Sequence, residues 1–182
     1  AVLQREVDAR IYYGLTDAEL RNYYDANRAR FLGVTLSEIF LSLAGHGEVD
    51  VQAKAAEIVA AARGGADFGE LAAKNSERQT NGVRIAETTK GQLLDEKGQP
   101  RFYLLSEVPP VILNAIKDVT TGGISDPIKT DDGYTVLRVN ARDDSFKENL
   151  VRGMMTQERS EKEREEYLRK LRREAFIKPA PN

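Results

Sequence analysis

The chain has 182 residues, of which 41% are hydrophobic and 31% charged, and its formal net charge is −2. This length and this apolar share suffice for one large domain, or for one domain with an extension, that buries a core. The near-neutral charge gives no indication of a nucleic-acid partner. Because the chain has no cysteine, disulfides, thiolate metal sites and a cysteine nucleophile are excluded. No apolar run reaches the roughly 18 residues of a membrane span.

The start of the chain predicts two helices. Apolar residues recur at helical spacing through residues 2–13. The motif Thr16-Asp17-Ala18-Glu19 then has the form of a capping box, in which the threonine and glutamate side chains satisfy free backbone N–H groups. The helix that follows carries Leu20, Tyr24 and Phe31 on one face. We expect this aromatic face to pack against another helix.

The next part of the chain alternates between β-forming and helical patterns. Residues 34–43 are rich in β-formers and predict a strand. Helices are expected at 51–63, with Asp50 as the N-cap, and at 67–75. Residues 76–100 are polar and have no clear period, so we expect a long irregular loop, a kind of segment that often carries function.

A hairpin is predicted for residues 122–139. The segment 124–130 is apolar and β-branched, and 134–139 alternates between two faces. Asp132-Gly133 between them supplies residue types that tolerate the positive φ of a hairpin turn. A helix precedes the hairpin and begins at Pro109-Pro110, where a missing N–H costs nothing. The mixture of helices and a small antiparallel sheet predicts an α+β fold.

A long, highly charged helix is predicted for residues 146–177. Its acidic and basic residues interleave, which argues against a basic tail for nucleic acid. Its few apolar residues recur at helical spacing and, like the aromatic face of the N-terminal helices, have no other evident partner. We therefore expect the two terminal segments to pack together. The apolar residues concerned are Leu150, Met154, Leu168 and Leu171.

The predicted hairpin also carries a family resemblance. Ten positions match a pattern of fixed spacing: Gly123, Ile124, Ser125, Pro127, Ile128, Thr130, Gly133, Tyr134, Val136 and Leu137. This pattern resembles the end of a parvulin domain, one of the unrelated groups of peptidyl-prolyl isomerases. The resemblance extends back through 36–41 and 66–72. The helices on either side make the layout similar to foldases of the SurA and PrsA type from the bacterial envelope.

The resemblance implies three segments. Residues 1–33 are the N-terminal part of a split, chaperone-like helical domain, 34–142 are a parvulin-like domain of the PpiC type, and 143–182 supply the long helix that completes the helical domain. It also implies a periplasmic or other extracytoplasmic location. Because no signal peptide opens this chain, we expect a processed or trimmed product, with further N-terminal helices in the full protein.

The resemblance also implies where chemistry takes place. A parvulin lowers the barrier to rotation about an X–Pro bond, about 18–20 kcal/mol, without a covalent intermediate. The family uses two facing histidines, a cysteine or aspartate nearby, and apolar residues that grip the proline ring. In this chain Glu38 and Thr135 stand at the histidine positions and Arg78 at the cysteine or aspartate position, whereas Thr130 is retained. We therefore expect weak isomerase activity.

The substrate pocket is expected to involve Ile85, Val108, Ile112 and Tyr134, with Ile112 at the position of a family aromatic residue. A glycine-rich run of the family is reduced here to residues 81–85. The chain's single histidine, between two glycines, is expected on a surface loop. No metal-ligand spacing or phosphate-binding loop is present, so no metal and no cofactor are expected.

Three functions stay open. The first is a foldase that binds extended segments of unfolded envelope proteins and isomerises weakly. The second is an active isomerase that uses the substituted polar set. The third is a non-catalytic assembly module that forms a homodimer through its terminal helices. Unfolded polypeptides are the expected partners, with no nucleic acid and no integral membrane segment.

Overall fold

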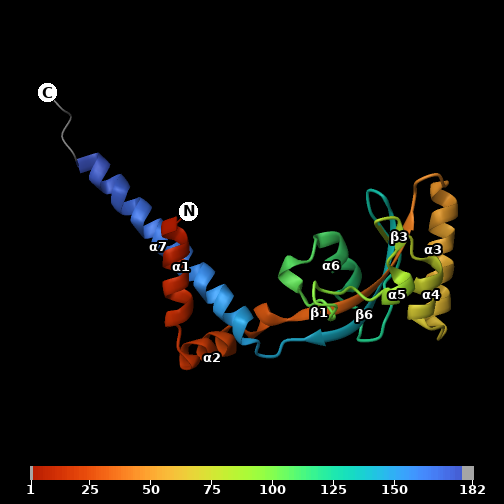
Figure 1. Ribbon diagram of the computed structural model, residues 1–182, viewed down its shortest axis with the longest axis horizontal. Coiled ribbons are helices and arrows are strands. Elements are labelled where there is room, and N and C mark those ends of the chain that lie inside the picture. The colour runs from red at the N-terminus through yellow and green to blue at the C-terminus, as the bar shows by residue number, and fades with distance from the viewer. Residues whose placement is uncertain (1, 178–182) are drawn as a thin grey trace. The chain divides into compact units, whose positions relative to one another are not determined.

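The structure is a computed structural model that describes residues 2–177. The chain divides into two compact units (Figure 1). One, here called the helical unit, is formed by Ala1–Phe31 together with Ser145–Asn182, and the other, the sheet unit, by Leu32–Asp144. Within the described residues, no helix combines the length and the apolar character that crossing a bilayer requires.

The helical unit consists of α1 (Val2–Gly14), α2 (Asp17–Ala26), a 3₁₀ turn η1 (Arg28–Phe31) and α7 (Glu148–Ile177). The predicted capping box begins α2: the Thr16 hydroxyl accepts from the Glu19 N–H at 3.2 Å, and the Glu19 carboxylate accepts from the Thr16 N–H at 2.9 Å. Both α1 and α2 pack on α7. The expected association of the N- and C-terminal segments is therefore confirmed.

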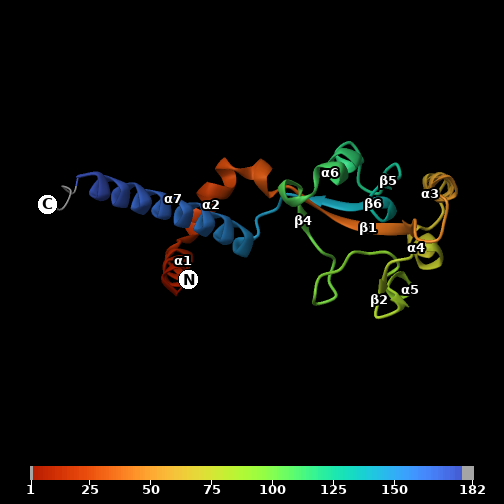
Figure 2. The same cartoon turned by 90° about the horizontal axis from the view of Figure 1, so that it is seen from above.

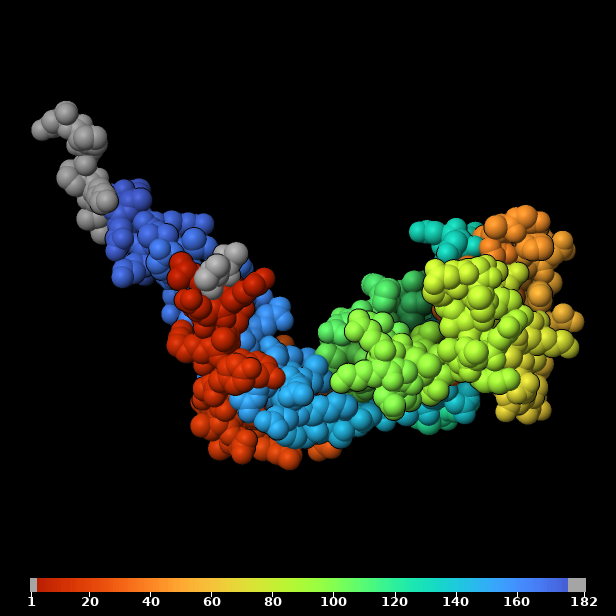
Figure 3. Space-filling view, in the orientation of Figure 1, coloured from red at the N-terminus to blue at the C-terminus, as the bar shows by residue number. Residues whose placement is uncertain are grey.

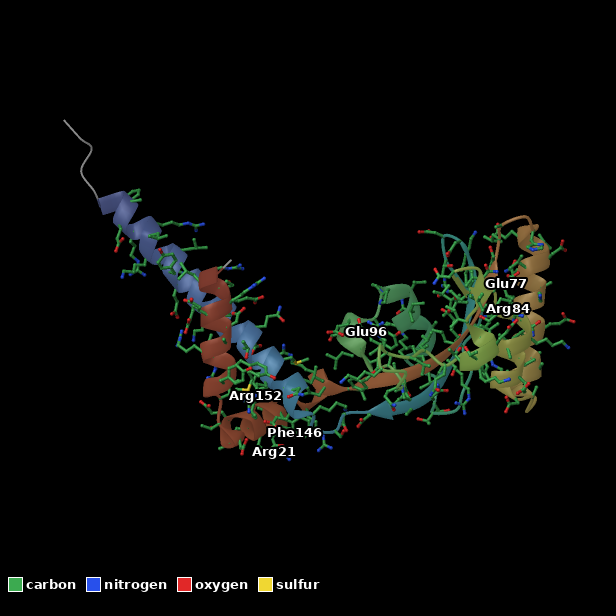
Figure 4. The ribbon with its side chains drawn as sticks, viewed as in Figure 1. Arg21, Glu77, Arg84, Glu96, Phe146 and Arg152 are labelled. Carbon is green, nitrogen blue, oxygen red and sulfur yellow. The ribbon has the colours of Figure 1, made fainter. Side chains whose placement is uncertain are left out.

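The core of the helical unit is apolar and aromatic. It comprises Leu15, Leu20, Tyr24, Phe31, Val151 and Met155, with Tyr23, Phe146, Leu150 and Met154 at its edge. The Arg21 guanidinium stacks 3.7 Å from the centre of the Phe146 ring, and Arg152 donates to the Tyr12 carbonyl oxygen at 2.7 Å (Figure 4). These two arginines extend the apolar contact with cation–π and capping interactions at the end of α1.

The expectation that Leu168 and Leu171 join this core is wrong. These two side chains are 44% and 41% exposed. The reason is length: α1 has 13 residues and α7 has 30. At about 1.5 Å per residue, α1 covers less than half of α7.

The sheet unit is built on an antiparallel sheet of four strands in the order β4-β1-β6-β5. The long central pair is β1 (Gly33–Ser42) and β6 (Gly133–Asp143), and the edges are β4 (Tyr103–Leu104) and β5 (Ile128–Lys129). The helices are α3 (Glu48–Arg63), α4 (Phe68–Asn75) and α6 (Pro110–Ile116), with a 3₁₀ turn η2 (Leu105–Glu107) before α6. The predicted α+β class is confirmed.

The two faces of this sheet have different partners. On one, the α3–α4 face, the apolar residues of the strands pack against α3 and α4: Ile39, Leu41, Tyr134 and Val136. On the other, the α6 face, strand residues pack against α6: Val34, Leu36, Ile128, Leu137 and Val139. In Figures 1 and 2, α3 and α4 gather at the end of the sheet where β1 ends, whereas α6 lies over its middle.

One irregularity interrupts the central pair. Leu36 lies opposite Val139 and Thr35 lies opposite Ala141, so Asn140 is an extra residue that forms a β-bulge. The bulge brings the Asn140 amide within 2.9 Å of the Ser37 hydroxyl oxygen, to which it donates.

Two expected local features differ in the structure. The helix α3 begins at Glu48 after Gly47, so Asp50 lies in the first turn instead of capping it. The expected loop 76–100 contains a small hairpin, β2 (Gln79–Thr80) with β3 (Val83–Arg84), followed by the short helix α5 (Ala86–Thr89). This segment, yellow-green in Figure 3, forms much of the visible surface of the sheet unit.

The positive φ angles also lie elsewhere than predicted. Asn81 and Gly82 have φ of 52° and 78° in the turn of the β2–β3 hairpin. This is the conformation for which an Asn-Gly dipeptide is best suited. Among the described residues, neither Asp132 nor Gly133 has a positive φ. The turn before β6 is closed by a hydrogen bond of 2.8 Å from the Thr130 N–H to the Gly133 carbonyl oxygen.

Candidate functional site

The register of β1 and β6 brings several of the predicted site residues to one face. Glu38 lies opposite Leu137, and Phe40 lies opposite Thr135. Directly opposed residues of an antiparallel pair point to the same side, and alternate residues share that side. Since Leu137 packs on the α6 face, Glu38 and Thr135 also belong to that face, as diagonal neighbours on adjacent strands.

The Glu38 carboxylate is held by Arg78. The Arg78 Nε donates to Glu38 Oε1 at 2.9 Å, and the Glu38 side chain is only 15% exposed. The Arg78 guanidinium also lies 3.9 Å from the centre of the Phe40 ring and 3.7 Å from Asp132 Oδ2. A carboxylate this buried needs such a partner. Glu38 and Arg78 therefore form a single ion pair that rests on the Phe40 ring.

The two threonines of the predicted site differ in their hydrogen bonding. The Thr130 hydroxyl donates to Asp132 Oδ1 and the Gly133 carbonyl oxygen, each at 3.1 Å. The Thr135 hydroxyl is fully buried and, within the described part of the chain, has no hydrogen-bond partner. An unsatisfied buried hydroxyl costs about 1–3 kcal/mol. A buried polar atom kept at such a cost calls for an explanation, and a role in a functional site is one.

A cavity of about 300 Å³ adjoins the ion pair. Glu38, Arg78 and Ile85 line it together with Leu93 and Tyr103. Three residues that the sequence analysis singled out therefore meet at one cavity. Its wall combines apolar side chains with a charged pair, which is the usual make-up of a site that binds a small or extended ligand.

The hairpin next to this cavity is firmly anchored. Arg84, on β3, donates from Nε to the Ser76 carbonyl oxygen at 2.9 Å and from Nη2 to that of Ala73, at the C-terminal end of α4. The Glu77 carboxylate accepts from the Ser42 N–H at 2.6 Å. Figure 4 marks Glu77 and Arg84 at this point. The backbone that carries Arg78 and Ile85 is thus tied to both a helix and β1.

Leu93 is a wall residue that sequence reasoning missed. The Leu93 N–H donates to the Leu36 carbonyl oxygen at 3.0 Å, so its segment runs beside β1, and its side chain packs on the α6 face. Gly91, with φ of 81°, makes this approach feasible: a Cβ there would lie 2.6 Å from the Ala72 Cβ. The signal in the sequence is the tripeptide Gly91-Gln92-Leu93, a glycine followed closely by an apolar residue in a polar stretch.

The remaining predicted pocket residues separate. Ile112, half-buried on α6, packs on the α6 face with Leu93. Val108 is buried at the end of η2. Tyr134 lies on the α3–α4 face, because it is adjacent to Thr135 and neighbouring strand residues point to opposite sides. The structure therefore does not bring Tyr134 together with the other candidates.

Tyr134 instead takes part in a polar cluster at the start of α3. Its hydroxyl donates to Glu48 Oε1 at 3.1 Å, and the same carboxylate pairs with Lys129. The hydrogen bonds from Lys129 and then Tyr134 lower the pKa of the Glu48 carboxyl below its ordinary value. Burial, followed by the hydrogen bond to Glu48, raises the pKa of the Tyr134 hydroxyl. This cluster stabilises the sheet end away from the α6 face.

The chain's single histidine does not line the cavity beside the Glu38–Arg78 pair. His46 is exposed in the turn after β1. Over the range that the structure describes, no three histidine, cysteine, aspartate or glutamate residues are grouped so as to hold a metal ion.

A curled antiparallel sheet of four strands flanked by helices matches the architecture of parvulin domains. The chain belongs to the family of PPIC-type PPIase domains, whose family model matches residues 15–148. Peptidyl-prolyl isomerisation is the activity that this family's description states.

Two curated proteins illustrate the relationship. The chain is 31% identical over 142 residues to the chaperone SurA of a Polaromonas species, an alignment covering 75% of this chain and 27% of that protein. It is 28% identical over 165 residues to the foldase protein PrsA of Halalkalibacterium halodurans, covering 90% of this chain and 43% of that protein. The chain thus spans less than half the length of these curated relatives.

Solved structures share the fold. A PpiC-type peptidyl-prolyl cis-trans isomerase domain superposes with a TM-score of 0.51 at 19% identity, covering 65% of this chain and 97% of that one. The peptidylprolyl isomerase PrsA from Bacillus cereus superposes with a TM-score of 0.50 at 18% identity, covering 99% of this chain and 62% of that one. At these identities the likeness concerns the fold alone.

Proposed function

We propose that this chain belongs to a foldase of the bacterial envelope, that it binds extended segments of unfolded proteins, and that it isomerises X–Pro bonds only slowly. The family membership supports the reaction class. The names of the two curated relatives, a chaperone and a foldase, support unfolded polypeptides as clients. The envelope location rests on the resemblance to foldases of the SurA and PrsA type. The α6 face of the sheet unit is the proposed binding surface.

The observation that carries this proposal is the Glu38–Arg78 ion pair next to the partnerless Thr135 hydroxyl. Catalysis of amide rotation requires polar groups that are aimed at the twisted amide and not already engaged. Arg78 is committed to two carboxylates and an aromatic ring. An ionised Glu38 only accepts hydrogen bonds. Thr135 offers a single hydroxyl, so little transition-state stabilisation is available.

Binding makes lower demands than catalysis. The cavity of about 300 Å³ has apolar walls at Ile85, Leu93 and Tyr103, which suit a proline ring or a side chain of an extended segment. Ile85 is 37% exposed, so this residue adds apolar surface at the rim of the cavity. Contacts of this kind stabilise a bound peptide whether or not its amide is twisted.

A protease-free isomerisation assay on a panel of proline tetrapeptides tests the catalytic half of the proposal. We expect kcat/KM below about 10⁴ M⁻¹s⁻¹, the lower end of ordinary enzymes. A value above this for any peptide of the panel would establish the alternative, an active isomerase with a substituted polar set.

Placing histidines at positions 38 and 135 tests whether these two positions belong to the reacting site. The double variant Glu38→His with Thr135→His should raise kcat/KM by about tenfold or more, since positioned polar groups of this kind contribute 10²–10⁴-fold at best. The control Glu57→His with Thr80→His adds two histidines at exposed positions and should change nothing. An absence of gain in a folded double variant would show that Glu38 and Thr135 do not occupy the reacting site.

A second pair of variants tests client binding. Ile85→Ser removes apolar surface that lines the cavity, and Val83→Ser removes similar surface of the same hairpin outside it. In an aggregation-suppression assay with an unfolded client, Ile85→Ser should weaken the effect about fivefold to thirtyfold, in keeping with the loss of about 1–2 kcal/mol of apolar burial. Equal effects of both changes would argue against the cavity as the binding site.

A further inference from the structure

A second cavity, of about 650 Å³, lies on the α3–α4 face of the sheet unit. Its rim is formed where α3 ends and α4 begins, at Ala62 and Phe68. Its floor is a stretch of sheet that these helices do not cover. The Glu38–Arg78 pair and the Thr135 hydroxyl lie on the opposite face of the same sheet, so this cavity is distinct from the proposed isomerase site, although Thr89 and Gln92 line both cavities.

The floor of the cavity is polar. Residue pairings between adjacent antiparallel segments place Gln92 beside Ser37, Ser37 beside Arg138, and Arg138 beside Ile124. These four residues therefore form one row across the strands. The bulged Asn140 connects the row: its amide nitrogen donates to the Ser37 hydroxyl oxygen at 2.9 Å, and its oxygen accepts from Arg138 Nη1. Gln92, Ser37, Arg138 and Asn140 all line the cavity.

The charges around the cavity leave one cation without a counter-ion. Lys90 is 3.4 Å from the Glu70 carboxylate, and the Asp67 carboxylate accepts from the Glu70 N–H at 2.8 Å as the cap of α4. Arg138 has the neutral Asn140 oxygen as an acceptor and, among the described residues, no carboxylate partner. A guanidinium has five N–H donors in a planar fork that matches a carboxylate. Most of the Arg138 donors are therefore available toward the cavity.

From this geometry we propose that the cavity binds an acidic side chain of a polypeptide. Arg138 holds the carboxylate, and the Ser37 hydroxyl and the Gln92 amide donate beside it. The cavity is far larger than a single oxyanion and falls in the range of about 300–1,000 Å³ that accommodates larger ligands. Its apolar walls at Ala62, Phe68 and Ile124 suit the alkyl and backbone parts of a peptide. Acidic client segments would thus be held on the face opposite the proline site.

Fluorescence anisotropy with the full chain tests this proposal. The probe is a labelled decapeptide of glycine and serine with a central Asp-Glu-Asp, and its partner carries Asn-Gln-Asn instead. Neither peptide contains proline or aromatic residues, so a failure here leaves the proposed isomerase function untouched. We expect the acidic peptide to bind more tightly than its amide partner. Arg138→Gln should weaken the acidic peptide about tenfold or more, as expected for losing a charged, bidentate contact.

Matched variants make the outcome decisive. Lys117→Gln removes the same charge from an exposed position outside the cavity and should leave binding within about twofold. Arg138→Lys keeps the charge and should recover part of the affinity. Ala66→Phe fills the cavity without changing charge and should weaken binding even if Arg138→Gln fails to fold.

Three results would overturn the proposal. The first is equal binding of the acidic and amide peptides. The second is equal weakening by Arg138→Gln and Lys117→Gln, which would indicate a general charge effect. The third is displacement of the acidic peptide by an equal concentration of inorganic phosphate, which would define a small-anion site instead of a peptide site.

Discussion

The two faces of the β1–β6 pair carry their polar side chains in different places. On the α3–α4 face, the centre is a closed apolar core around Ile39 and Val136, both fully buried, and the polar side chains lie at the two ends. On the α6 face, a carboxylate, a guanidinium and an unsatisfied hydroxyl stand in the middle of the sheet.

Residues that mainly stabilise the sheet unit and residues of the candidate site therefore lie on different faces of a single sheet. A polar group at the edge of a core is readily satisfied by water or a neighbour, whereas one in the middle costs stability unless it is paired. The α6 face keeps such groups where the α3–α4 face has none. We therefore expect substitutions on the α3–α4 face to reduce mainly stability, and substitutions at the polar groups of the α6 face to reduce mainly activity.

Ile39→Ala should have the largest effect on stability. Ile39 is 0% exposed in the core of the α3–α4 face, and truncating such a residue costs about 2–5 kcal/mol. Its neighbour Glu38 points to the other face and pairs with a partly exposed arginine, so Glu38→Ala should cost about 1 kcal/mol or less. Urea unfolding followed by far-UV circular dichroism measures both. Equal losses would contradict the proposed division between the faces.

Gly91→Ala should follow, at about 2 kcal/mol. Gly91 has φ of 81°, and a Cβ there would lie 2.6 Å from the Ala72 Cβ and 2.9 Å from the Glu38 carbonyl oxygen. Gly98→Ala is the control, because Gly98 has φ of 76° and open space around it. The control carries only the backbone cost, about 1 kcal/mol. If thermal unfolding shifts equally for both, the close approach of the 91–93 segment to β1 and α4 is not limiting.

Thr135→Val should stabilise the protein by about 1 kcal/mol. Valine has nearly the shape of threonine and removes the hydroxyl that lacks a partner, so the desolvation cost disappears. Thr130→Val is the matched change at a hydroxyl whose single proton has two acceptors within reach, and it should destabilise by a similar amount. A loss of stability on Thr135→Val would mean that this hydroxyl is satisfied in solution.

The smallest effect concerns pH and the α3–α4 face. Because Lys129 and Tyr134 lower the pKa of Glu48 in the folded state, its contribution to stability is complete above its unfolded pKa. That contribution is lost as the pH falls through the lowered, folded pKa. The difference in urea midpoint between the wild type and Glu48→Gln should therefore shrink from pH 7 toward pH 2.5, and more salt should reduce it at pH 7. A difference that does not change with pH would show that the carboxylate is not coupled to folding.

The parts of the fold that follow from local pattern were predictable from the sequence. The capping box at Thr16 needs only four consecutive residues, and the alternation of Tyr134, Val136 and Arg138 correctly placed them on one face. The β2–β3 hairpin was missed although Asn81-Gly82 is a strong turn signal, because its strands have two residues each and show no period.

The candidate site was predictable only in part. The family resemblance named Glu38, Arg78 and Thr135, but the arrangement of these groups depends on strand register and on contacts between residues far apart in the chain. The ion pair joins residues 40 positions apart. The role of Leu93 depends on a segment that approaches β1 from outside the regular strands. No local pattern in a single sequence encodes such pairings.

The bulge at Asn140 determines how β6 responds to the loss of a residue. Counted by odd and even numbers, Val139 and Arg142 belong to opposite sides of the strand, yet Val139 packs on the α6 face and Arg142 donates at 2.8 Å to the Val119 carbonyl oxygen just after α6. The extra residue shifts the alternation of sides along β6 by one position. A chain that lacked Asn140 would keep every other side chain on its present side, whereas losing a residue between Tyr134 and Leu137 would turn part of the strand over.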